Sequence, residues 1–151
     1  MTDARAAKDP LALGLGSLTT GIGFGGACLT AAQVIAGIMR ERLDPALYRE
    51  SAPDPLTAGL ILAVGVGGGY SWYRSWAVEN LWQRGVIAVL AAVGAILVGF
   101  LAAPVDGLFG LIGLVVWLAL TLAVGVAGSR WADRGRGTDD QPAQDSGEPS
   151  A

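Results

Sequence analysis

The sequence predicts an all-α polytopic membrane protein whose four transmembrane helices form one compact bundle. Four long apolar stretches cover residues 11–39, 56–78, 83–103 and 108–128. Each is long enough to cross a bilayer, which takes roughly 20 apolar residues. Hydrophobic residues make up 52% of the chain. We expect one transmembrane domain over residues 10–131, between a polar arm (1–9) and a disordered acidic tail (132–151).

The first predicted helix begins at the dipeptide Asp9-Pro10. An Asp side chain can accept from the free N–H groups of the first turn, and proline at the next position loses no hydrogen bond there. Small residues then recur every three or four positions and form one continuous face: Ser17, Gly21, Gly25, Cys28, Ala32 and Ala36. Because apolar helices have little hydrophobic drive to associate inside lipid, such faces hold a bundle together by close backbone approach. We interpret Cys28 as a small packing residue of this face.

The second predicted helix begins at Asp54-Pro55, after a loop in which Asp44-Pro45 predicts a short extramembrane turn from Pro45 to Glu50. Its glycine-rich middle leads into an aromatic segment at its end. The aromatic segment consists of Trp72, Tyr73 and Trp76. We expect these three side chains, together with Trp82 and Trp131, to anchor the helices at one membrane interface.

The third predicted helix is capped by Asn80 and carries a second small-residue face, formed by Gly85, Ala88, Ala92, Ala95 and Gly99. The faces of the first and third helices predict that these two are central in the bundle. The fourth helix should follow a tight turn at residues 104–107, which would make the third and fourth helices an antiparallel hairpin.

The distribution of lysine and arginine predicts the orientation. With four spans, one face carries seven of these residues, namely Arg5, Lys8, Arg74, Arg84, Arg130, Arg134 and Arg136, and the other carries three, Arg40, Arg42 and Arg49. Cytoplasmic loops hold the excess of positive charge. The sequence therefore predicts a multi-pass protein of the cell membrane with both termini in the cytoplasm.

The residue types present disfavour several kinds of chemistry. Histidine is absent, and with it the commonest metal ligand and general base. We expect no catalytic residues, metal or cofactor. The net charge is −3, with the acidic excess in the tail, so nucleic acid is not an expected partner.

Three polar side chains within the predicted spans are candidates for an internal site. The Gln33 amide and the Trp117 indole N–H each need a hydrogen-bond partner, and Thr121 lies one helical turn beyond Trp117. For Gln33 we favour a bond to another helix over contact with a ligand.

The sequence favours a non-enzymatic membrane protein, an accessory, assembly or scaffold subunit that associates through small-residue helix faces. Its expected partners are the lipid bilayer and either a second copy or another membrane protein. The alternative is a subunit of an oligomeric channel or transporter with an uncharged pathway. No signature of a known family is evident in these residues.

Overall fold

The computed structural model describes residues 9–42, 55–78 and 80–136, and their regular structure is entirely helical. Three helices are long and apolar enough to cross a membrane: α1 (Pro10–Arg42), α5 (Leu81–Phe100) and α6 (Ala102–Arg136). The predicted turn from Pro45 to Glu50, most of the N-terminal arm and the tail beyond Arg136 lie outside the described residues. The predicted disordered tail began at residue 132, but residues 132–136 belong to α6, where Ala132 and Gly135 are buried. An all-helical chain with apolar helices of spanning length is therefore confirmed.

The second apolar stretch is divided into three consecutive elements. These are α3 (Pro55–Val64), the π-helix η1 (Gly65–Tyr70) and the short helix α4 (Ser71–Arg74). The stretch begins at Pro55 as predicted, but its helix ends at Arg74 and the chain turns before residue 78. Glycine-rich backbone leaves room for the wider π turn, and the backbone of the buried Gly67 approaches both α1 and α5.

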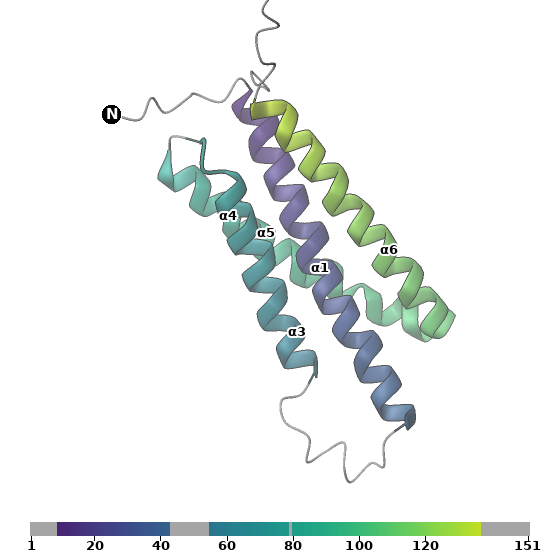
Figure 1. Cartoon of the computed structure of the whole chain (residues 1–151). Helices are drawn as coiled ribbons and strands as arrows, with labels where there is room; N and C mark the ends of the chain where they lie inside the picture. The colour runs from purple at the N-terminus through teal and green to yellow at the C-terminus, as the bar shows by residue number, and fades with distance from the viewer. Residues whose placement is uncertain (1–8, 43–54, 79, 137–151) are drawn as a thin grey trace, which may run out of the picture.

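Helix α1 is the centre of the molecule. Figure 1 shows it between α3 and α6, with α5 passing behind it, and it contacts every other element. Of the 18 most apolar consecutive residues of α1, 44% are buried; the corresponding share is 11% in α5 and 22% in α6. The prediction of a central helix therefore holds for the first helix and not for the third, because α5 buries only one narrow row of small residues.

The expected turn at residues 104–107 is wrong. These residues lie within α6, whose first turn accommodates Pro104 because its missing N–H would have no partner there in any case. The chain bends at Gly110 instead, where φ is 61° and ψ is −154°, a conformation that glycine adopts readily and other residues rarely do.

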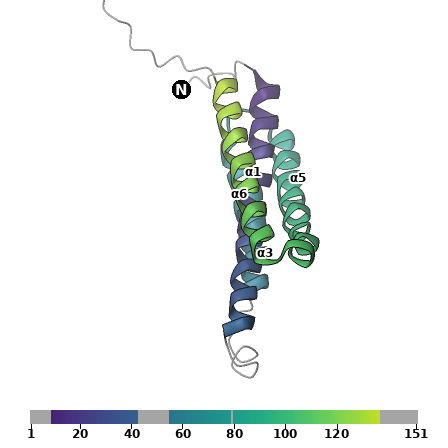
Figure 2. The same ribbon diagram turned by 90° about the vertical axis from the view of Figure 1, so that its right-hand side faces the viewer.

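The third and fourth helices run in opposite directions from their junction, as expected of an antiparallel hairpin, but they do not pack closely on each other. From their junction α5 and α6 run apart (Figure 2), and α6 packs chiefly along α1 with only marginal contact to α5. The bend at Gly110 and the small residues along α6 direct it to α1. The described helices thus surround α1 rather than forming a closed ring in which each helix packs on the next.

Both predicted caps within the described residues are present. The Asp9 carboxylate accepts from the backbone N–H groups of Leu11 and Ala12, each at 3.1 Å. The Asn80 side chain accepts from the backbone N–H of Trp82 at 3.0 Å. These bonds satisfy N–H groups that the first turn of a helix leaves free, and they fix where α1 and α5 begin.

Candidate functional site

Two faces of α1 carry the helix contacts. The first is the predicted small-residue face, on which Ser17, Gly21, Gly25 and Ala32 are buried and Cys28 is partly buried. It packs on α3, η1 and α5: a Cβ added to Gly25 would lie 2.6 Å from Ala95 Cβ and 2.8 Å from the Ala63 oxygen. The Ser71 hydroxyl at the start of α4 donates to the Ser17 carbonyl at 2.8 Å.

The second face of α1 packs on α6 and was not identified from the sequence. Gly16 and Gly23 lie so close to α6 that a Cβ on Gly23 would be 2.8 Å from the Thr121 oxygen, and one on Gly16 would be 2.7 Å from Ala132 Cα. On α6, a Cβ on Gly128 would be 2.6 Å from the Thr20 nitrogen. The sequence feature that could have revealed this face is the two-turn spacing of Gly16 and Gly23, which places both on one side of a helix.

The predicted face of α5 is only partly used. Its buried residues are Ala91, Ala95 and Gly99, which follow a strict four-residue spacing. The other predicted members, Gly85, Ala88 and Ala92, are half-buried. Ala91 takes their place in the buried row of α5 because it faces α1, where a Cβ added to Gly21 would contact it.

Gln33 and Trp117 cap the C-terminal end of α5 from two different helices. The Gln33 side-chain Nε2 donates to the Gly99 carbonyl at 3.0 Å, and the Trp117 indole N–H donates to the Val98 carbonyl at 3.2 Å. Both carbonyls belong to the last turn of α5, where the regular helical bonding ends; the backbone N–H of the C-cap residue Leu101 also points to the Gly99 carbonyl. In an apolar environment an unpaired carbonyl is costly, so these two side chains let α5 end without water.

Thr121 makes a bond within its own helix. Its hydroxyl donates to the Leu118 carbonyl at 2.9 Å. The structure therefore does not gather the three candidate residues into one site: Gln33 and Trp117 meet at the end of α5, and Thr121 lies in the contact of α6 with α1.

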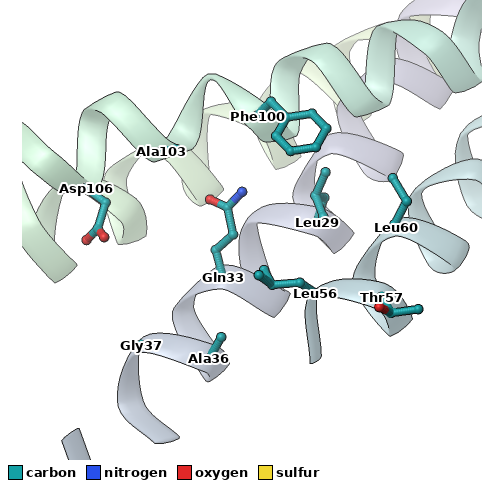
Figure 3. A pocket seen from close by; sticks show the side chains of 10 residues that line it. All are labelled: Leu29, Gln33, Ala36, Gly37, Leu56, Thr57, Leu60, Phe100, Ala103 and Asp106. Carbon is teal, nitrogen blue, oxygen red and sulfur yellow. The ribbon is translucent and has the colours of Figure 1, made fainter. Parts of the chain in front are cut away.

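A pocket opens beside Gln33, and we call it the Gln33 pocket (Figure 3). Its volume is about 400 Å³, and α1, α3 and the junction of α5 and α6 form its walls. The lining is mainly apolar, with polar groups only at Gln33, Thr57 and Asp106. Asp106, which the sequence placed in a loop, stands in the first turns of α6 and is exposed.

A polar cluster missed by the sequence analysis joins α4 to α6 at the opposite end. The Arg74 guanidinium lies 2.7 Å from the Asp133 carboxylate and donates to the Ser129 carbonyl at 2.8 Å and to its hydroxyl at 3.0 Å. Arg136 donates to the Arg74 carbonyl at 2.6 Å. With 11% of its side chain exposed, Arg74 is the most deeply placed charge of this cluster.

Aromatic side chains surround this polar end of the molecule. The Arg84 guanidinium lies 4.7 Å from the centre of the Trp72 ring, and Arg74 lies 6.0 Å from that of Tyr70. The side chains of Trp76, Trp82 and other predicted interface residues are exposed.

Sequence spacing alone could not pair Arg74 with Asp133, because 59 positions separate them.

Within the described ranges, no group of three or more histidine, cysteine or acidic side chains is arranged to hold a metal ion. Comparison with family models, with curated proteins and with solved structures gives no match. The fold defines the protein's class, a helical protein whose described residues include three helices of membrane-spanning length, and its role has to be argued from its own residues.

Proposed function

We propose that this chain is a small non-enzymatic membrane protein, an accessory, assembly or scaffold subunit that binds another membrane protein or a second copy. The observation that carries the proposal is an apolar hollow on α6 that no other described element fills. Its volume is about 370 Å³, and every lining residue belongs to α6 itself: Val105, Phe109, Ile112, Gly113, Val116, Trp117 and Leu120. We call it the α6 hollow.

The predicted small-residue face of α1 is already occupied by other helices of the same chain, so a partner would have to bind elsewhere. Gly21 and Gly25 pack on η1 and α5 of the same chain, so they are unavailable to a partner. The outer side of α6, where Ile112, Val116 and Leu120 are exposed, is open to a partner. Van der Waals packing into such a hollow is the main source of helix association in lipid.

We further propose four passes through the cell membrane with both termini in the cytoplasm. Two contacts support an even number of passes: the Asp9 backbone N–H donates to the Gly135 carbonyl at 3.1 Å, and Arg74 pairs with Asp133. The start of α1, the end of α4 and the end of α6 therefore lie together. The excess of arginine at this end supports its cytoplasmic placement.

Native mass spectrometry of the tagged protein, extracted gently from its own membrane, tests the association. We expect a second copy or a foreign subunit at fixed stoichiometry. Leu120→Trp would fill the α6 hollow and release that partner, whereas Leu122→Trp, a similarly exposed position outside the hollow, would retain it. A wild-type protein that is monomeric and free of other subunits would refute the proposal.

A subunit of an oligomeric channel or transporter is the second candidate. The Gln33 pocket favours it, because it places an uncharged amide beside apolar walls at one end of the helices. A closed homo-oligomer in the same mass spectra, together with solute flux in liposomes, would support this candidate. A foreign subunit at fixed stoichiometry would support the accessory role.

A further inference from the structure

The Gln33 pocket has the dimensions of a small-molecule site. Its volume of about 400 Å³ lies within the range of roughly 300–1,000 Å³ typical of such sites, which combine apolar walls with a few polar groups. Leu29, Leu56, Leu60 and Phe100 supply the apolar walls (Figure 3). The α6 hollow shares no lining residue with this pocket, so the two can be tested separately.

Asp106 differs from the other carboxylates whose side chains the structure describes. Asp9 caps α1 and Asp133 pairs with Arg74. Asp106 lines the pocket, and among the described residues it has neither a hydrogen bond nor an ion pair. A carboxylate beside apolar walls is stabilised by a cation, so this position suits a positively charged group.

Gln33 adds a hydrogen-bond acceptor to the same pocket. Its amide nitrogen is held by the Gly99 carbonyl, and Figure 3 shows the amide oxygen turned towards the side on which Asp106 lies. The bond to Gly99 thus fixes the orientation of the amide. The ring of Phe100 at the edge of the pocket offers a surface on which a cation or an apolar group can pack.

We propose that the Gln33 pocket binds an organic ammonium ion with an apolar body. Asp106 balances the charge of the ammonium group, the Gln33 amide oxygen accepts one of its N–H bonds, and the leucine side chains cover the apolar body. With both termini in the cytoplasm, the pocket would open towards the outer side of the membrane. The proposal goes beyond association and does not depend on it.

The test uses 4-phenylbutylamine, which is protonated at neutral pH, and its neutral analogue 4-phenyl-1-butanol. Binding to the full chain in nanodiscs of zwitterionic lipid is measured by saturation-transfer NMR, with empty nanodiscs as the blank. We expect saturable binding of the amine, at least about fivefold tighter than that of the alcohol, as one partly exposed ion pair can provide.

Three variants separate a specific site from general charge or apolar partitioning. Asp106→Asn should remove the preference for the amine. Asp9→Asn removes the same charge elsewhere and keeps its helix cap, so it should bind like the wild type. Gly37→Leu should weaken both probes, because Gly37 lines the pocket and a Cβ there meets nothing within 4 Å.

The outcomes decide the proposal. Equal affinity for amine and alcohol in the wild type would overturn it, and so would an Asp106→Asn variant that still prefers the amine. Loss of the preference in Asp9→Asn as well would assign the effect to surface charge and overturn it too. All three variants must elute as the wild type does in gel filtration, which their open surroundings favour.

Discussion

The hydrogen bond from Gln33 to the end of α5 predicts a measurable loss of stability when the amide is removed. Gln33→Met keeps the length of the side chain but cannot donate to the Gly99 carbonyl, which Nε2 now contacts at 3.0 Å. The carbonyl lies in the last turn of α5, where the backbone N–H of Leu101 also points to it, so the lost donor is only partly replaced.

The expected cost follows from the environment of this bond. Burying an unsatisfied carbonyl costs about 1–3 kcal/mol in soluble proteins. Hydrogen bonds between membrane helices average roughly 0.6 kcal/mol and reach about 1.7 kcal/mol. Because Gln33 is only part-buried and its pocket can admit a water molecule, we expect Gln33→Met to destabilise the fold by about 1 kcal/mol.

Reversible unfolding of the protein in mixed micelles with increasing SDS measures this difference. Thr121→Val is the matched control, since the Thr121 hydroxyl bonds only within its own helix, to Leu118, and its removal should cost less than about 0.5 kcal/mol. Trp117→Phe should behave like Gln33→Met, because it frees the neighbouring Val98 carbonyl. If Gln33→Met and Thr121→Val unfold at the same SDS fraction, the capping argument is refuted.

Three further predictions concern packing, the bend and the polar cluster. Gly25→Leu should abolish the monodisperse gel-filtration peak, because its Cβ would meet Ala95 and the Ala63 backbone, while Gly37→Leu, which has open space, should retain it. Gly110→Ala should lower stability in the SDS titration by about 1–2 kcal/mol because of its positive φ, and Gly107→Ala in the same exposed segment should not. Arg74→Met should lower the stability by about 1–2 kcal/mol, because Arg74 donates to Ser129 as well as to Asp133. Asp133→Asn should lower it by less than about 1 kcal/mol, because Asp133 is half-exposed. A larger loss for Asp133→Asn than for Arg74→Met would contradict this geometry.

Local features of the sequence were read correctly where a few neighbouring residues decide them. Asp9 and Asn80 cap the helices that they precede, because a cap bonds only to the following turn. The start of α3 at Pro55 follows from the fixed φ of proline in the same way. Residues 104–107 were misread because the Pro and Gly there are equally compatible with a turn and with the first turns of a helix.

The Gln33 interaction shows the limit of such reasoning. The sequence predicted that its amide would bond to another helix rather than to a ligand, and the amide nitrogen does contact α5. It could not identify the acceptor, since the position of Gly99 depends on how α5 crosses α1. The pairing of Arg74 with Asp133 depends likewise on how α4 and α6 meet.

The sequence by itself determined the helical class and the apolar helices of membrane-spanning length, because hydrophobic runs and caps act over one or two helical turns. It also marked the small-residue face of α1 that packs on α3, η1 and α5, but not the face that packs on α6. Only the tertiary structure decided which of these faces meet, because glycine and alanine permit close approach without selecting a partner. That choice made α1 central, placed α6 along α1 instead of α5, and brought Gln33 and Asp106 to one pocket.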